Sequence, residues 1–555
     1  MNVKNDSNVW RHWRGLGGWN YYFLLKFVLL WLGYLNFHAL ENLIFAAFLL
    51  FPLSSPRLHR WRHVVAIPIG FIVFYNDTWL PGMASIMANG SQVAGFSPAY
   101  LLELLGRFIN WQWVGAAFVM LVAYLFISQW VRVTVFTVLV LLGLNLMSVT
   151  GPLFKWGTPV AVATTSSFTP TSSLATPAPG VSTANAGTAQ PSMGAPPTNE
   201  NLKAYLNQFY QTERQRVTRF PQTLPADAQP FDLLFIHICS LSWSDLEATE
   251  MKNSPLWGKF DIVFNDFNSA TAYSGPASIR LLRASCGQES HKDLYSPANQ
   301  QCYLFDNLAK LGFTPQLMLD HSGQFDNYMN NLREDADIQA PLMSQAGIGN
   351  ELTSFDGEPI YDDLQLLDRW LEQQTKAGDT RSATFFNVIP LHDGNRNIGA
   401  RSPADYKARA TKLFSQLDMF FQQLEKSGRR VVVVVVPEHG AALIGDKMQI
   451  PGLRDIPSPS ITHVPVGVKL IGIKAPSPQP PLAINAPTSY LALSELVSRL
   501  VDGKLFTAPQ IDWAALTQNL PQTAAVSEND TSVIIDYQGK PFIQLNGGDW
   551  VAYPQ

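Results

Sequence analysis

The sequence has no long basic run and a formal net charge of only −4, so nucleic acid is not expected as a partner. No internal repeat is present either. Acidic residues are few before about residue 155, where the composition is strongly apolar, and a mixed globular composition begins only after about residue 200. Since 555 residues are too many for one ordinary domain, the two parts are expected to be different domains.

Five stretches of the apolar part suit a lipid bilayer, which predicts an α-helical membrane domain over residues 1–155. A spanning helix needs about 20 apolar residues, so the first two stretches are short, and they alternatively form one hairpin or re-entrant unit. No small-residue cleavage site follows the first stretch, which excludes a cleavable signal peptide. The stretches run approximately over Tyr21–Phe37, His38–Leu53, His63–Leu80, Trp113–Ile127 and Val131–Val149.

Lysine and arginine residues determine the expected orientation. They are present in the N-terminal tail, in the loop Arg57–Arg62 and at Arg132. Because positively charged loops stay in the cytoplasm, placing all three on that side requires five spans and puts the second half of the chain outside. The segment Pro98–Asn110 would then be an extracytoplasmic amphipathic helix. The spans serve either as an anchor alone or as a platform that presents a lipid to the outer domain.

Residues 156–200 are predicted to be a flexible linker. From Gly157 to Asn199 the chain consists largely of Ala, Thr, Ser, Pro and Gly, with almost no charge. Such a segment cannot bury enough apolar surface to offset the entropy lost on ordering. A linker of this kind lets the domain that follows it reach some distance from the membrane. Alternatively, its N-terminal part lies along the surface of the following domain.

Residues 201–555 have the alternating pattern of an α/β domain. Three apolar runs, Phe231–Ile238, Ala383–Ile389 and Val431–Val436, are typical of strands buried on both faces. The six valines of the last run strongly favour strand over helix. Helical patterns lie between the runs, so a mostly parallel central sheet is predicted. The other expected elements are helices at Asn201–Arg219, Tyr303–Leu311, Tyr361–Gln374 and Pro403–Lys426, a strand at Val464–Leu470 and short strands within Ser532–Tyr553.

Residue types that bind metals follow all three apolar runs. Cys239 follows the first, His392 comes shortly after the second, and Glu438 and His439 follow the third. Ligands of such sheets bind beyond the carboxyl ends of the strands. A thiolate, a carboxylate and an imidazole together favour zinc. The alternative for Cys239 is a buried, inert thiol.

Ser274 is the candidate nucleophile. It lies among small residues just before the helical pattern that begins near Ile279. A helix N-terminus offers backbone N–H groups to a phosphate, and a metal at the serine oxygen would activate it. The alternative is a serine that only caps the helix, which is the commoner role.

The other two cysteines, Cys286 and Cys302, bracket a polar loop. They are expected to form a disulfide because the charge rule places this domain in an oxidising compartment. That pairing leaves Cys239 for the metal. Three free thiols would instead require a cytoplasmic domain.

These motifs resemble the alkaline phosphatase superfamily and, within it, the membrane-bound phosphoethanolamine transferases; the cellulose phosphoethanolamine transferases are the most similar. The segments Phe235–Trp243, Ala272–Ala277 and Pro437–Gly440 carry the resemblance, together with the paired cysteines, and it extends over the whole chain. The cysteine at the end of the first strand is the specific mark, because most relatives have an acid there. Glu438 is also unusual, since Asp more often precedes this histidine.

The resemblance implies an alkaline-phosphatase-like α/β domain and a tetrahedral Zn²⁺ site. In it, Ser274 is both nucleophile and ligand, and Cys239, Glu438 and His439 complete the site. Other residues are implied to line the pocket. They are Tyr273, His392 as general acid or base, Arg454 as the residue that holds the transferred phosphate, and His463 as a further pocket residue.

The implied reaction transfers phosphoethanolamine from phosphatidylethanolamine to a glucose hydroxyl of nascent cellulose, with C6 as the expected position. It proceeds through a phosphoethanolamine–serine intermediate. The resemblance places the protein in a bacterial inner membrane, with residues 201–555 in the periplasm and the cellulose synthase complex as a possible neighbour. Two alternatives stay open at this point. One is another phosphotransferase of the superfamily, acting on lipid A or a different glycan, and the other is a non-catalytic scaffold of the synthase complex.

Overall fold

The structure is a computed structural model that describes residues 15–53, 55–78, 96–107, 111–150 and 195–554. The chain divides into two compact units. The first combines Met1–Leu80 with Asn110–Ala195, and the second combines Pro81–Ile109 with Pro196–Gln555. Most of the predicted linker lies outside the described residues.

The first unit is helical. Within the part of the chain that the structure describes, no helix is both long and apolar enough to cross a membrane. A helix nevertheless lies in each of the five stretches, so the five-span bundle stays a prediction. The helices are α2 (Trp19–Trp31), α3 (Ala39–Leu50), α4 (Pro56–Asp77), α8 (Trp111–Ile127) and α9 (Val133–Thr150).

A buried polar network joins three of these helices. Lys26 of α2 forms an ion pair with Asp77 at the end of α4, and both side chains are fully buried. The Lys26 ammonium also donates to Asn42 Oδ1 at 2.7 Å, and Asn42 Nδ2 donates to Asp77 Oδ2 at 2.7 Å. A buried charge without a partner costs several kcal/mol, so each member of the network holds the others in place.

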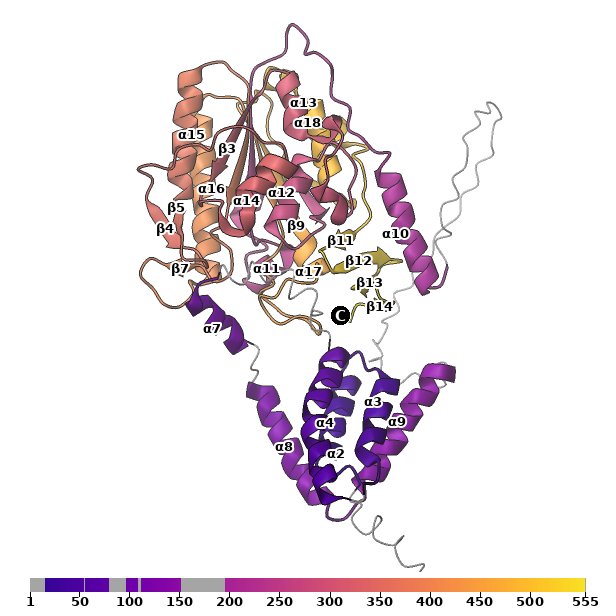
Figure 1. Ribbon diagram of the computed structural model, residues 1–555. Coiled ribbons are helices and arrows are strands. Elements are labelled where there is room, and N and C mark those ends of the chain that lie inside the picture. Colours follow the sequence, from indigo (N-terminus) through magenta and orange to yellow (C-terminus); the bar gives the residue numbers. More distant parts are fainter. Residues whose placement is uncertain (1–14, 54, 79–95, 108–110, 151–194, 555) are drawn as a thin grey trace, which may run out of the picture. The chain divides into compact units, whose positions relative to one another are not determined.

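The second unit is built around a seven-stranded sheet (Figure 1). All strands run in one direction except β9, which is antiparallel to both of its neighbours. The prediction of a mostly parallel sheet is therefore confirmed. In spatial order the strands are β10 (Leu482–Ile484), β2 (Ile262–Asn268), β9 (His463–Ile471), β8 (Val431–Pro437), β1 (Asp232–Ile238), β6 (Ser382–Val388) and β3 (Thr314–Leu319).

Helices cover both faces of this sheet (Figure 1). In β1, Leu233 and Phe235 pack into the core on one face, whereas Leu234 and Ile236 pack into the core on the other. The valines of β8 alternate in the same way, which explains why both strands are continuously apolar. One face is covered by α12 (Ser274–Leu282), α13 (Leu304–Lys310) and α18 (Tyr490–Leu500), and the other by α11 (Trp243–Ala248), α15 (Asp363–Ala377) and α16 (Tyr406–Ser427).

The sequence patterns did not predict β2 or β3. The central residues of β2 are polar and partly exposed, and the first half of β3 is exposed at the sheet edge. Neither strand therefore has the continuous apolar run of β1, β6 and β8. The predicted strand near Val464 corresponds to β9, and the predicted helices near Tyr303, Tyr361 and Pro403 correspond to α13, α15 and α16.

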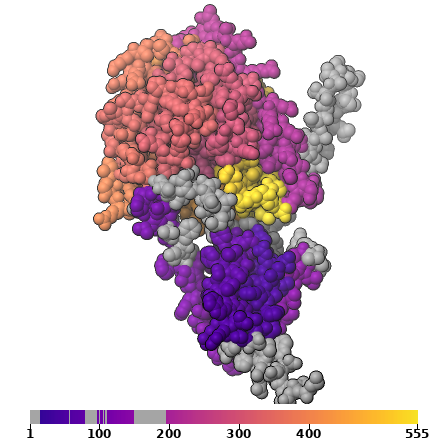
Figure 2. Space-filling model, in the orientation of Figure 1, coloured from indigo at the N-terminus to yellow at the C-terminus, as the bar shows by residue number. Residues whose placement is uncertain are grey.

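Two small sheets complete the second unit. The C-terminal sheet packs on α10 (Asn199–Glu213), which buries Phe209 against Tyr537 and Trp550. Figure 2 shows this C-terminal segment in yellow beside the magenta α10. Cys286 and Cys302 form the predicted disulfide. The strands of these sheets are β11 (Val526–Glu528), β12 (Ser532–Tyr537), β13 (Lys540–Leu545) and β14 (Trp550–Ala552) in one, and β4 (Asn350–Thr353), β5 (Pro359–Tyr361) and β7 (Arg396–Asn397) in the other.

Candidate metal centre

The carboxyl ends of β1 and β8 bring three potential metal ligands together. Ile238 is in register with Pro437, so Cys239 and Glu438 leave the sheet at the same level. Cys239 Sγ lies 3.9 Å from His439 Nε2, which lies 3.5 Å from Glu438 Oε2. The three ligand atoms are all within 4.8 Å of one another, and all three side chains are buried. One ion can therefore contact all of them.

Ser274 is the fourth residue at this place. It begins α12, and its Oγ lies 3.6 Å from Cys239 Sγ. The N-cap residue of α12 is Tyr273, which forms no side-chain cap hydrogen bond, so Ser274 is not the cap. Its hydroxyl is instead directed at the metal-binding residues, at the positive end of a helix that attracts phosphate.

The surrounding hydrogen bonds orient His439 and Glu438 so that each has an atom available to bind a metal. His439 Nδ1 donates to the Gly440 carbonyl at 2.9 Å, which leaves the lone pair of Nε2 on the side of the candidate ligands. Asn387 donates to Glu438 Oε1, whereas Glu438 Oε2 is buried and has no hydrogen-bond partner. A buried carboxylate oxygen beside a thiol and an imidazole fits zinc, which takes S, N and O ligands tetrahedrally.

Electrostatics indicates the same kind of occupant. Burial raises the pKa of the Cys239 thiol, and the neighbouring Glu438 raises it further. Burial also raises the pKa of Glu438 to about 7. Burial and the Arg454 guanidinium lower the pKa of His439 well below its usual value. When Cys239 and Glu438 lose their protons, a divalent cation would compensate the two negative charges. It also needs a neutral imidazole as its third ligand, and the lowered pKa of His439 provides one.

Arg454 and His392 adjoin the candidate metal residues. Arg454 Nη1 donates to Ser240 Oγ at 2.9 Å, and Nη2 donates to His392 Nε2 at 3.2 Å. His392 Nδ1 donates to the Asp393 carbonyl at 2.7 Å. Burial and Arg454 lower the pKa of His392 to about 3, so this imidazole is neutral at pH 7.

The remaining two predicted residues have different surroundings. Tyr273 directly precedes Ser274, and burial together with the Asp455 carboxylate raises the pKa of its phenol. His463 begins β9, where its Nε2 donates to the Asn265 carbonyl at 2.7 Å and its side chain is 44% exposed. Among the described residues, the contacts of His463 do not include the four candidate metal residues.

Sequence patterns missed several residues that support the site. Ser240 has a positive φ of 67°, and its hydroxyl accepts from Arg454. Asn529, in the turn between β11 and β12, accepts from the backbone N–H of Ala272 at 3.2 Å and donates to the Arg454 carbonyl at 3.2 Å. It thereby connects the loop before Ser274 to the loop of Arg454. Asn387 carried a recognisable signal, because it is the amide in the otherwise apolar predicted strand Ala383–Ile389.

Asp245 of α11 holds the loop that follows Glu438 and His439. Its fully buried carboxylate accepts from the backbone N–H groups of Ala441 at 2.7 Å and Leu443 at 3.2 Å, and from the hydroxyl of Ser242 at 2.8 Å. Gly440 makes this approach possible, because a Cβ there would lie 2.8 Å from Asp245 Oδ2. A side chain in α11 thus fixes the path of the metal-binding loop.

Replacing Asp245 with alanine is expected to lower the free energy of unfolding by about 3 kcal/mol, because several buried donors lose a charged acceptor. Urea unfolding of the purified protein measures this change. As a control, Glu250→Ala removes only an exposed ion pair with Lys407 and is expected to change stability by less than about 1 kcal/mol. Equal stabilities of the two variants would show that Asp245 does not hold the loop.

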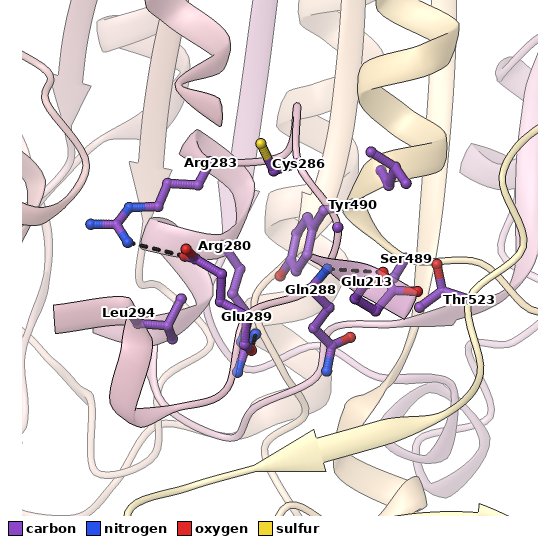
Figure 3. Close-up of a pocket in the computed structure, with 12 residues that line it drawn as sticks. Glu213, Arg280, Arg283, Cys286, Gln288, Glu289, Leu294, Ser489, Tyr490 and Thr523 are labelled. Atoms are coloured by element: carbon purple, nitrogen blue, oxygen red, sulfur yellow. Dashed lines mark hydrogen bonds and ion pairs between the residues drawn. The ribbon is translucent and has the colours of Figure 1, made fainter. Parts of the chain in front are cut away.

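A separate pocket lies behind α12, next to the disulfide (Figure 3). Its lining includes Arg280, Arg283, Glu289 and Tyr490, but none of the candidate metal ligands. Arg283 Nη1 donates to Glu289 Oε2 at 3.0 Å across its edge. The pocket is thus distinct from the metal centre, although α12 contributes to both.

The fold and the site define an α/β protein with a candidate zinc centre and a serine at the carboxyl edge of its sheet. The chain matches the family models described as the cellulose biosynthesis protein BcsG C-terminal domain, over residues 186–550, and N-terminal domain, over residues 19–146. It therefore belongs to the family of BcsG cellulose biosynthesis proteins.

Two relatives are similar over their whole length. The cellulose biosynthesis protein BcsG of Salmonella typhimurium strain LT2 is 60% identical over 552 residues, covering 99% of this chain and 98% of the relative. The protein of the same name from Escherichia coli strain K12 is 58% identical over 556 residues, covering 100% and 99%.

One solved structure that the comparison found is the C-terminal periplasmic domain of EcEptC from Escherichia coli. It aligns at 12% identity and a TM-score of 0.41, and the alignment covers 57% of this chain and 93% of that chain. The family assignment rests on the sequence matches.

Proposed function

We propose that this protein is a zinc-dependent transferase that moves phosphoethanolamine from phosphatidylethanolamine to glucose hydroxyls of nascent cellulose, with C6 as the acceptor position. The observation that carries this proposal is the position of Ser274 Oγ, at the N-terminus of α12 and 3.6 Å from Cys239 Sγ. A serine beside a group of metal ligands and a helix N-terminus suits phosphoryl transfer. Membership of a cellulose biosynthesis family supports cellulose as the acceptor.

Cys239, Glu438, His439 and Ser274 would hold the zinc ion. Bound there, zinc would supply Lewis acidity and lower the pKa of the Ser274 hydroxyl. The charge that develops on the phosphoryl oxygens would be neutralised by Arg454, whose guanidinium already lies at the edge of the site. The N-terminal N–H groups of α12 face the same charge.

The reaction has two steps. In the first, Ser274 Oγ forms a bond to phosphorus, the phosphorus–oxygen bond to the lipid breaks, and diacylglycerol leaves with a proton. In the second, a glucose hydroxyl forms a bond to phosphorus, the bond to Ser274 breaks, and the serine regains its proton. His392 is the residue that takes the proton of the glucose hydroxyl, because its Nε2 lies 3.2 Å from Arg454, the residue that holds the transferred phosphate.

We also propose a location for each part of the chain. Residues 1–155 would form five spans in a bacterial inner membrane, where the lipid donor is found. Residues 156–200 would be the flexible linker, and residues 201–555 the catalytic domain in the periplasm. The disulfide Cys286–Cys302 supports this side of the membrane, because disulfides persist in oxidising compartments.

The proposal is tested on the polymer. Cellulose isolated from cells that express the protein is expected to carry phosphoethanolamine at C6, detected by phosphorus NMR and mass spectrometry. Lipid A from the same cells is analysed in parallel. Modified lipid A beside unmodified cellulose would assign the transferase a different acceptor. Neither modification, together with purified protein that binds no zinc, would instead indicate a scaffold.

The affinity for zinc is expected to decrease as the pH is lowered from about 8 to about 6. Burial raises the pKa of Glu438 to about 7 and raises that of the Cys239 thiol above this pH range, so zinc must displace a proton from Cys239 throughout and from Glu438 below about pH 7. For each proton that zinc displaces, the dissociation constant for zinc increases about tenfold when the pH is lowered by one unit. Competition with a zinc chelator at several pH values measures the slope. Below about pH 7, Glu438→Gln should reduce that slope by up to about one proton, and a pH-independent affinity would contradict the assignment.

A further inference from the structure

A short helix from the N-terminal part of the sequence belongs to the second unit. It is α7 (Pro98–Arg107), which lies in the sequence between the third and fourth predicted spans. The predicted helix is therefore confirmed over Pro98–Arg107, whereas residues 108–110 lie outside the described residues and the extracytoplasmic position stays a prediction. Figure 1 shows α7 close to β7, which begins four residues after His392 in the sequence.

Polar contacts attach α7 to the segment that follows His392. The Tyr100 hydroxyl donates to Asp393 Oδ2 at 2.9 Å. One turn later, Glu103 accepts from Arg396 Nη2 at 3.3 Å, and the Arg396 side chain is only 8% exposed. The helix is thus held at two successive points of one loop.

The Tyr100 ring is also enclosed by this loop. Tyr100 is 4% exposed, and a Cβ at position 394 would lie 2.5 Å from its Cε2 atom. Gly394, which has a φ of +79°, therefore leaves the space that the ring fills. Because the Tyr100 ring is enclosed in this way, its position relative to the loop is fixed.

Aromatic contacts extend from α7 to the face of His392. Phe96 lies just before the helix and packs edge-on against Phe355, with ring centroids 5.8 Å apart. Tyr100 also contacts Phe355, with centroids 6.1 Å apart. Phe355 in turn stacks on His392, with centroids 3.9 Å and ring planes 25° apart. The backbone of Ser97 adds a hydrogen bond of 3.3 Å to the Phe355 carbonyl.

These two routes meet at His392. Its Nδ1 donates to the carbonyl of Asp393, the residue whose carboxylate accepts from Tyr100. Its ring face rests on Phe355, which Tyr100 and Phe96 support. A catalytic group must be placed to within about 0.5 Å to act efficiently. Contacts that fix Asp393 and Phe355 therefore also affect the rate of the transfer step in which His392 takes part.

We propose that Tyr100 is a positioning residue of the active site, which holds the His392 imidazole in place through Asp393 and Phe355. A segment between two predicted membrane spans thereby supports the loop that carries His392. This inference rests on the proposed function, because it assumes that His392 takes part in the transfer. Tyr100 itself contacts none of the candidate metal ligands among the described residues.

The test uses the full chain, purified in detergent, with phosphatidylethanolamine as donor and a soluble cello-oligosaccharide as acceptor. Tyr100→Ala is expected to lower kcat about 10- to 100-fold, with zinc content and the KM for the lipid unchanged. Tyr100→Phe keeps the ring and loses only the hydrogen bond, so a smaller decrease is expected. Leu102→Ala on the same helix is the matched control, because that side chain is 71% exposed.

Double variants separate a positioning role from a general loss of stability. In the His392→Ala background, Tyr100→Ala is expected to have no further effect, since both changes remove the same contribution. Multiplicative losses, or a Tyr100→Ala variant as active as wild type, would overturn the inference. If Tyr100→Ala does not fold, the same comparison with Tyr100→Phe decides. Absence of transfer by the wild-type protein would instead contradict the proposed function.

Discussion

Replacing Ser274 with alanine is expected to abolish the transfer of phosphoethanolamine. The Ser274 hydroxyl, at the N-terminus of α12 and 3.6 Å from Cys239 Sγ, is placed to form the covalent intermediate. Loss of a catalytic nucleophile lowers kcat by about a thousandfold or more. Cells that express this variant should therefore still make cellulose, but the polymer should carry no phosphoethanolamine by mass spectrometry.

A control on the same helix makes this result specific. Ser278 lies about one turn after Ser274, and its hydroxyl shares a hydrogen bond of 2.7 Å with the Tyr328 hydroxyl rather than with a candidate metal ligand. Ser278→Ala should therefore keep the modification. The proposed intermediate gives a second measurement, since incubation with lipid should leave a phosphoethanolamine group on Ser274 in the wild-type protein. Cellulose that is still modified in the Ser274→Ala cells would show that the mechanism is wrong.

Replacing Cys239 with alanine is expected to remove most of the bound zinc. The thiol is fully buried, and its sulfur lies within reach of both His439 and Ser274. A thiolate contributes strongly to the affinity for zinc, so the dissociation constant should increase by at least about 100-fold. Elemental analysis of the purified protein and chelator competition measure the loss, and transfer activity should fall in parallel.

The Cys239→Asp variant distinguishes a ligand from a packing residue. A carboxylate also binds zinc but is harder than a thiolate, so this variant should retain more metal than Cys239→Ala. If Cys239 were only a buried, inert thiol, aspartate would be the more damaging change, because it places a charge in an apolar site. Equal zinc content in wild type and Cys239→Ala would remove Cys239 from the metal centre.

Much of the second unit could be predicted from local patterns. The valines of β8 and the apolar residues of β1 form strands because they are buried on both faces of a sheet, and burial of that kind requires a continuous apolar sequence. Once these strands are taken as parallel, Cys239 and Glu438 must meet at one edge. The main candidate ligands could therefore be read from residues that directly follow strands.

Residues that act through long-range contacts left no such signal. Phe355 lies in the loop between β4 and β5, and nothing in its neighbours indicates that it stacks on His392. Asn529 contacts the Arg454 carbonyl from the turn between β11 and β12. The strands β2 and β3 were missed because they are partly exposed, so their sequences mix polar and apolar residues.

The sequence by itself determined the division into an apolar N-terminal part and a longer α/β part, the central strands, and the residue types available for a metal. These features depend on composition and on neighbours in the chain. Only the tertiary structure decided that Ser274 lies beside Cys239, that Asp245 holds the metal-binding loop, and that α7 packs next to His392. Such pairings are separated by tens to hundreds of residues, and they arise from packing across the sheet and its loops, which no local pattern encodes.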